Sequence, residues 1–237
     1  MMKKGGIQMV KMMLDAGHGG KDPGAVAHGL QEKDLTLHLA VKAGAYLTSR
    51  YDCDVIYTRT KDVYLSPSER ADLANEAGAD LFCSFHINSA ANPAARGFET
   101  FKFNGAAGKT AMLQILVHGA AVKVTDRHEV LDRGMKDENF AVLRETAMPA
   151  VLTETLFISN KEDARLLKSD AFLNSMAAAY GEGLARAAGA KERKAQAADN
   201  RLFRLHTGTF TGQAEADNQA EMLRKAYGWT IYVKEEG

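Results

Sequence analysis

Two histidines stand where the sequence predicts the carboxyl ends of strands, a common place for functional sites in α/β sheets. His18 lies in the glycine-rich run over residues 15–20, directly after the apolar run over residues 9–14. Glycines on both sides allow a sharp backbone turn and leave the imidazole uncovered by neighbouring side chains. A polar loop histidine without a partner explains the same residues equally well.

His86 lies near the end of a second apolar run, over residues 80–88, and Glu32 precedes a predicted helix. The alternatives are a buried, hydrogen-bonded histidine and an acidic residue that complements a helix dipole. Two histidines and one glutamate at the same edge of a sheet could bind Zn²⁺, since catalytic zinc sites take three N/O ligands and leave a position for water. The compact HExxH pattern is absent, so spacing alone does not identify the site.

Glu154 is a carboxylate inside a predicted strand, over residues 149–157, that is otherwise apolar on both sides. Burying it unpaired is strongly unfavourable, so it needs a metal, a cation or a proton. Beside a zinc-bound water it could act first as general base and then as general acid. A structural ion pair with an arginine or lysine is the alternative.

Alternating strands and helices must position these residues, which indicates an α/β domain with a mostly parallel or mixed sheet. Strands are predicted over residues 9–14, 53–58, 80–88, 98–103 and 149–157. Helices are predicted over residues 35–49, 67–77, 108–124 and 170–188. Asp34 is the expected cap of the first helix, whereas Ser66, Pro67 and Glu69 form a capping-box signature for the second.

Composition excludes several other classes of protein. The 237 residues carry 30 basic and 30 acidic side chains, and 46% are hydrophobic, as in an ordinary globular chain. Zero net charge gives no field that attracts nucleic acid, so we expect no nucleic-acid partner. We also expect no membrane insertion and no signal peptide, because no sufficiently long apolar run is present. Cys53 and Cys83 are expected to be small buried side chains in a reducing compartment.

The chain is expected to divide into a domain over residues 1–188, a linker over residues 189–200 and a small β-α-β module over residues 201–237. The linker contains no bulky apolar side chain. The module has strand patterns over residues 202–209 and 229–233 and a helical pattern over residues 215–227. So small a unit buries little by itself, so it must pack on the first domain or on a second copy of itself.

Four stretches of the sequence resemble the zinc-dependent N-acetylmuramoyl-L-alanine amidases of the Amidase_3 family (AmiC/CwlV type). In family order they are residues 14–25, residues 32–34, residues 68–75 leading to 84–88, and residues 149–160. The resemblance covers roughly residues 10–185 and implies a twisted six-stranded mixed sheet flanked by helices. It also implies that His18, Glu32 and His86 hold Zn²⁺ and that Glu154 is the catalytic acid/base. Arg133 lies in a less strict family segment and is a candidate substrate contact.

The resemblance implies a cell-wall hydrolase that cleaves the amide between N-acetylmuramic acid and the L-alanine of peptidoglycan. A zinc peptidase or deacetylase acting on another amide is an alternative, as is a non-catalytic peptidoglycan-binding protein. Without a signal peptide, the expected setting is the cytoplasm, with action on the wall after holin-mediated release or mother-cell lysis. This fits a phage endolysin or a sporulation amidase.

The C-terminal segment resembles half of a SPOR-type peptidoglycan-binding repeat, on residues 202–210 and 229–233. Since a full repeat is about twice as long, two tails would have to pair. A homodimer formed through this module is therefore expected if the module binds the wall.

Overall fold

The computed structural model describes residues 9–193, 212–227 and 233. The chain divides into two compact units, Met1–Lys194 and Ala195–Gly237. In the second unit the described part contains helix α7, Gln213–Tyr227, which confirms the helix predicted there. The strand predicted over residues 202–209 lies outside the described residues, as do residues 229–232 of the strand predicted over residues 229–233; residue 233 is described and is not part of a strand.

Seven strands of the first unit form one sheet in the order β7-β6-β8-β5-β1-β4-β9. β8, β5, β1 and β4 are parallel, β6 is antiparallel to β8, and β7 is parallel to β6. The mostly parallel mixed sheet is therefore confirmed. Its strands are β1 (Val10–Ala16), β4 (Tyr51–Tyr57), β5 (Leu81–Asn88), β6 (Phe98–Lys102), β7 (Asp132–Asp137), β8 (Ala150–Phe157) and β9 (Lys191–Glu192).

The count of seven strands differs from the expected six because β9 pairs antiparallel with the start of β4. This short strand lies inside residues 189–200, the expected linker, and Arg193 N donates a further hydrogen bond to Arg50 O. The first residues of the expected linker are therefore part of the sheet, as its edge strand next to β4.

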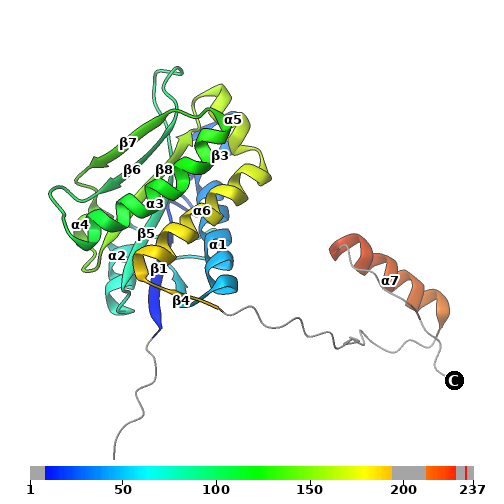
Figure 1. Ribbon diagram of the computed structural model, residues 1–237. Coiled ribbons are helices and arrows are strands. Elements are labelled where there is room, and N and C mark those ends of the chain that lie inside the picture. Colours follow the sequence, from blue (N-terminus) through cyan, green and yellow to red (C-terminus); the bar gives the residue numbers. More distant parts are fainter. Residues whose placement is uncertain (1–8, 194–211, 228–232, 234–237) are drawn as a thin grey trace, which may run out of the picture. The chain divides into compact units, whose positions relative to one another are not determined.

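Helices cover the two faces of the sheet unequally. Figure 1 shows α1, α3 and α6 lying across one face, where they enclose the larger apolar core. The other face carries a smaller apolar cluster beneath α2 and α4. The helices are α1 (Glu32–Arg50), α2 (Pro67–Glu76), α3 (Lys109–Thr125), α4 (Ala141–Glu145), α5 (Lys161–Leu167) and α6 (Asp170–Ala188), with a hairpin of β2 (Val26–Ala27) and β3 (Leu30–Gln31) and a 3₁₀ turn, η1 (Asp126–His128).

On the face covered by α2 and α4, residues that pair across neighbouring strands lie side by side in rows, because paired residues point to the same face. The first row is apolar and consists of Met13, Phe82 and Ala150. The second contains Asp15, Ser84, Leu152 and Phe101. The third contains His86, Glu154 and Glu99. Along each strand the face thus changes from apolar to ionisable within a few residues.

The starts of two helices test the predicted caps. α2 begins with the predicted capping box, in which Ser66 and Glu69 exchange hydrogen bonds. The prediction of Asp34 as the cap of α1 is wrong, because α1 begins at Glu32 and Asp34 lies within its first turn. Loop carbonyls replace a side-chain cap: Glu32 N donates to Ala25 O and Lys33 N donates to Pro23 O. Glu32 is thereby fixed as the first helical residue.

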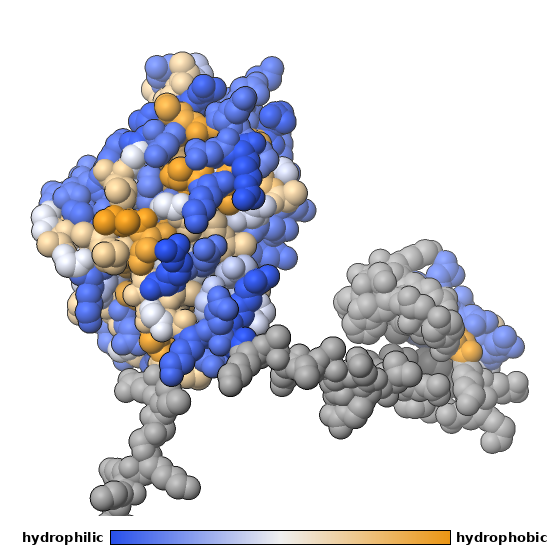
Figure 2. Space-filling model, in the orientation of Figure 1, coloured by the Kyte–Doolittle hydropathy of each residue, from blue (hydrophilic) through white to orange (hydrophobic). Residues whose placement is uncertain are grey.

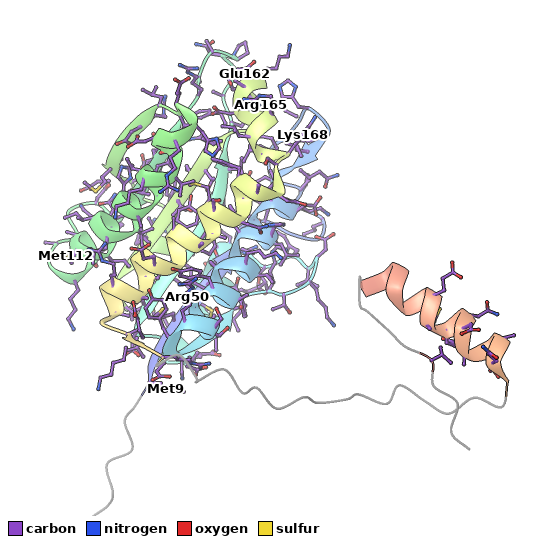
Figure 3. The ribbon with its side chains drawn as sticks, turned by 45° about the vertical axis from the view of Figure 1, so that its right-hand side comes forward. Met9, Arg50, Met112, Glu162, Arg165 and Lys168 are labelled. Carbon is purple, nitrogen blue, oxygen red and sulfur yellow. The ribbon has the colours of Figure 1, made fainter. Side chains whose placement is uncertain are left out.

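The two ends of the sheet are visible in Figure 3. Met9 precedes β1 at the amino end, whereas Glu162, Arg165 and Lys168 mark α5 and its cap, which follow the carboxyl end of β8, at the other end. The face in Figure 2 is mostly hydrophilic with small apolar patches, and Met112 and Ile115 of α3 are among the exposed apolar residues. Cys53 and Cys83 are free and buried, as predicted. None of the described helices has the length and apolar character needed to span a membrane.

Candidate metal centre

His18, Glu32 and His86 converge at the carboxyl end of the sheet although they are far apart in the sequence. One ligand atom from each lies within 4.8 Å of the others. His18 Nε2 is 3.1 Å and His86 Nδ1 is 3.0 Å from the same oxygen, Glu32 Oε1. The structure therefore brings the three predicted ligands together.

The geometry of this cluster fits a small divalent cation. Zn²⁺ binds imidazole nitrogen and carboxylate oxygen at about 2.0–2.2 Å, which places tetrahedral ligands about 3.4 Å apart. The two nitrogen-to-oxygen separations are slightly shorter than this. Small movements of the side chains would thus seat the ion, and two imidazoles with one carboxylate match a recurrent catalytic zinc set.

Hydrogen bonds fix the orientation of His18 and Glu32. His18 Nδ1 lies 2.8 Å from Asp22 Oδ2, so that this nitrogen donates to the carboxylate and Nε2 faces the cluster. Backbone amides of Ala25 and Ile87 donate to the two Glu32 oxygens, at 2.9 and 3.0 Å. Such supporting bonds hold ligands in place and raise the basicity of a ligating histidine. The sequence analysis did not identify Asp22, although its place four residues after His18 is a usable signal.

Two glycines make room for the ligands. A Cβ atom on Gly17 would lie 2.4 Å from His86 Cε1, so the imidazole rests against the bare backbone. A Cβ atom on Gly24 would lie 2.6 Å from Glu32 Oε2, and Gly24 has a φ of +64°. His18 itself has a φ of 60°, an unusual value for a residue with a side chain, and such strain concentrates at functional sites.

A buried ionic network holds the loop that carries His18. Arg70 donates to Asp15 Oδ1 and to the carbonyls of Ala16 and His18. Arg59 donates to the carbonyls of Ala16 and Gly17. Asp15 also accepts from Thr58 and Ser84. These residues, which sequence reasoning missed, satisfy the buried carbonyls of the loop and make its conformation part of the core.

The contacts within the cluster shift the pKa values of Glu32 and His18 in opposite directions. Burial alone would raise the pKa of Glu32, but hydrogen bonds from His18 and His86 hold that pKa well below its usual range. Burial opposes a charge on His18, yet hydrogen bonds and charges of Glu32 and Asp22 raise its pKa. Glu32 therefore stays ionised, and its negative charge is available to a cation.

Glu154 lies beside this cluster, paired in register with His86 on the adjacent strand. Its Oε2 atom is buried and has no hydrogen-bond partner among the described residues. Burial, followed by the charges of Glu32 and Glu99, raises the pKa of Glu154 well above its usual value. The structural ion pair considered for Glu154 is not found in the described part of the chain. The raised pKa instead favours the neutral form of this carboxyl group when no cation is nearby.

A β-bulge follows Glu154 directly. His86 pairs with Glu154, but Asn88 pairs with Phe157, so β8 has one extra residue over this interval. Leu156, within the bulge, has a φ of 67° although it is fully buried. Bulges commonly redirect side chains near functional sites.

Arg133 lies on β7, the edge strand two positions from β8 in the sheet. Its Nε atom donates at 3.1 Å to Glu99 Oε2, and Glu99 in turn pairs in register with Glu154. The structure thus places Arg133 next to a neighbour of Glu154, without a direct contact to the three clustered ligands.

Comparisons with known proteins agree with this geometry. The sequence profile described as N-acetylmuramoyl-L-alanine amidase, Amidase_3, matches residues 12–186. The endolysin of Bacillus phage SPP1 is 49% identical over 174 residues, which are 73% of this chain and 64% of the phage protein. A sporulation-specific N-acetylmuramoyl-L-alanine amidase of Bacillus subtilis is 39% identical over 213 residues, 90% of this chain and 80% of that protein. The chain thus spans less than two thirds of the phage relative.

A solved structure is similar over the first unit. The catalytic domain of CwlV, an N-acetylmuramoyl-L-alanine amidase from Bacillus (Paenibacillus) polymyxa var. colistinus, superimposes with a TM-score of 0.72 at 32% identity. The match covers 77% of this chain and 100% of that domain.

Proposed function

Because the chain belongs to the Amidase_3 family of N-acetylmuramoyl-L-alanine amidases, we propose that it binds Zn²⁺ and hydrolyses peptidoglycan. The bond cleaved is the amide between the lactyl group of N-acetylmuramic acid and the first L-alanine of the peptide. One observation supports this most directly: an unpartnered buried carboxyl oxygen, Glu154 Oε2, adjoins a preformed set of three metal ligands.

His18, Glu32 and His86 would hold the ion. When bound, Zn²⁺ polarises a carbonyl group and acidifies water, which is the chemistry that amide hydrolysis needs. The ligand set has one negative charge, on Glu32, so a divalent cation leaves the site positive. Positive charge close to Glu154 lowers the pKa of that carboxyl group and favours its ionised form.

Glu154 then moves the proton. Its carboxylate takes a proton from the water that attacks the scissile carbonyl, and the same group delivers that proton to the departing nitrogen of L-alanine. The C–N bond breaks, a carboxylate forms on the lactyl group, and a free amino group appears on the peptide. Burial of Oε2, without competing hydrogen bonds, keeps Glu154 ready for both transfers.

Substitution of Glu154 and His86 tests this proposal. Glu154→Gln should retain zinc but lower hydrolysis of purified peptidoglycan about 10²- to 10⁴-fold, because the proton carrier is lost. His86→Ala should lose both zinc and activity. Metal analysis and the release of new L-alanine amino termini measure the two effects. Wild-type turnover by zinc-loaded Glu154→Gln would refute the mechanism.

Product analysis separates this activity from its alternatives. A zinc peptidase would expose other amino termini, and a deacetylase would release acetate. A non-catalytic wall-binding protein would release no product, and nothing in the chain favours it because all four proposed site residues are present.

The expected domain division is also part of the proposal. We take residues 1–188 as the catalytic domain, residues 189–200 as a connection that begins by pairing with β4 as β9, and residues 201–237 as a module that binds peptidoglycan or pairs two copies. Action on the cell wall is supported by relatives described as an endolysin and as a sporulation-specific amidase.

A further inference from the structure

Two cations from β7 gather on one buried carboxylate beside Glu154. Glu99 Oε2 accepts from Arg133 Nε at 3.1 Å and from Lys136 Nζ. The other oxygen, Oε1, accepts from Asn88 Nδ2 at 2.6 Å. Both Glu99 oxygens thus accept hydrogen bonds from side chains, and Glu99 itself is not free to bind a metal.

The charges in this group do not cancel. Two cations face one carboxylate, which leaves one positive charge. The Glu99 side chain is 4% exposed, whereas those of Arg133 and Lys136 are 30% and 39% exposed. The buried Glu99 carboxylate therefore holds both cations, whose side chains remain partly exposed to solvent. Arg133 Nη2 has no hydrogen-bond partner in the part of the chain that the structure describes.

The backbone that presents Arg133 is fixed. Asp132 Oδ1 accepts from Gly134 N at 2.7 Å and lies 3.1 Å from Nε2 of the buried His118 on α3. The guanidinium carbon of Arg133 lies 4.8 Å from the ring centroid of Phe157, a cation–π contact. Arg133 also donates from Nη1 to Arg96 O at 3.4 Å, so its partly exposed side chain is held by Glu99, Arg96 and Phe157. A side chain held in this way loses little conformational freedom when it binds an anion.

The sheet gives the position of these cations relative to the proposed reaction. From β5, which carries His86, the order is β8, β6 and β7. Neighbouring strands lie about 4.8 Å apart, so β7 is about 14 Å from β5 and about 10 Å from β8. An extended peptide covers about 3.5 Å per residue. A peptide that crosses the strands from Glu154 on β8 therefore reaches β7 after about three residues.

We propose that Arg133 and Lys136 form a subsite for a carboxylate of the substrate peptide, about three residues beyond the scissile amide. This inference rests on the proposed function. In that substrate the lactyl carboxyl group is already part of the amide, so the sugar is uncharged, whereas carboxyl groups on the peptide are ionised at neutral pH. The subsite therefore orients the peptide half of the substrate toward β7.

Paired synthetic substrates test the subsite. One is a muramoyl tripeptide that begins with L-alanine and whose third residue has a free α-carboxylate, and the other has that group converted to a carboxamide. The zinc-loaded full chain should have a kcat/KM about tenfold or more higher for the carboxylate compound. In Arg133→Gln/Lys136→Gln this ratio should fall toward one, and in the wild type it should shrink as salt increases. Glutamine can still donate to Glu99, and thermal unfolding checks the fold of the variant.

Lys102→Gln is the matched control. Lys102 is a lysine of β6 that pairs with Asp137 instead of Glu99, so its loss should leave the ratio unchanged. If the double variant does not fold, Arg133→Lys, which keeps the charge but lacks the planar fork, should lower the ratio partially. An unaltered ratio in the folded variant, or an equal loss on both substrates, would overturn the subsite.

Two further outcomes remain distinguishable. If the wild type cleaves neither substrate and also fails on purified peptidoglycan, the proposed function is wrong and the subsite falls with it. If the double variant is impaired only on walls that carry phosphate polymers, the cations bind polymer phosphate and the peptide subsite is wrong.

Discussion

The two ends of one sheet face have opposite characters, although the same strands build both. At the amino end, Met13, Phe82 and Leu152 pack beneath α2 and α4. Two to four residues further along β1, β5 and β8, the same face carries Asp15, His86 and Glu154. We attribute stability to the first end and the proposed chemistry to the second. A rigid apolar end allows the other end to hold ionisable groups in unfavourable surroundings.

The buried network of Asp15, Arg59 and Arg70 lies where the apolar end of the face gives way to the ionisable end. Its guanidinium groups donate to the carbonyls of Ala16 and His18. The transition from apolar to polar surface is thus made without leaving buried polar groups unpaired. The following substitutions test whether the two ends act separately.

Loss of an apolar side chain should have the largest effect, and on stability alone. Phe82→Ala removes a fully buried ring from the cluster under α2 and α4, and we expect the free energy of unfolding to fall by about 3–5 kcal/mol. The zinc content and kcat of the protein that remains folded should change little. Denaturant unfolding and metal analysis measure both, with Phe82→Leu as the milder control. A matching loss of metal affinity would show that the two ends are coupled.

Adding one methyl group at the polar end should affect metal binding instead. In Gly17→Ala the new Cβ would collide with the His86 ring, at 2.4 Å from Cε1, so we expect zinc affinity to fall at least about tenfold. Competition with a chelator measures the affinity. The control is Gly119→Ala, where an added Cβ meets no atom within 4 Å, and which should bind zinc normally. Normal zinc affinity in Gly17→Ala would show that His86 does not need its present position.

Acid should weaken metal binding, because a proton and a metal compete for His18. The neighbouring acids raise the pKa of His18, so protonation begins at a higher pH than for an ordinary histidine. Zinc affinity should therefore fall, by up to about tenfold per pH unit, as the pH drops below that raised pKa. Titration calorimetry between about pH 8 and pH 6 measures this range around the ordinary histidine value.

The control for this pH dependence is Asp22→Asn, which removes one of the charges that raise the His18 pKa. In this variant the decline in affinity should begin at a lower pH. An unchanged profile would mean that another group controls the competition.

Sequence patterns were sufficient where local signals agreed with the fold. The helix over Asp170–Ala188 matches the predicted bounds, and the capping box at Ser66 is present because its hydrogen bonds are local. His18, Glu32 and His86 lie close together with Glu154 beside them, as expected for residues at one edge of the sheet. The sequence also indicated that Glu154 needs a metal, a cation or a proton, and its raised pKa agrees.

Patterns failed where tertiary contacts decide the structure. β7 is an edge strand of mostly charged residues, so it lacks the alternation that identifies a strand. The start of α1 depends on carbonyls from the preceding loop, which explains the error at Asp34. The partners of Asp15 and the two cations that contact Glu99 are 34 to 69 residues away in the chain, so only the folded sheet reveals them.

The extra residue in β8 decides where Phe157 lies relative to Arg133. Glu154 and Phe157 are three apart, so strict alternation would turn the phenylalanine toward the helical layer of α3 and α6. The bulge at Leu156 restores Phe157 to the side of Glu154, opposite Asn88, where its ring lies under the guanidinium of Arg133. Shortening β8 by one residue here would therefore rotate that aromatic platform away, even if every polar group of the reaction were left in place.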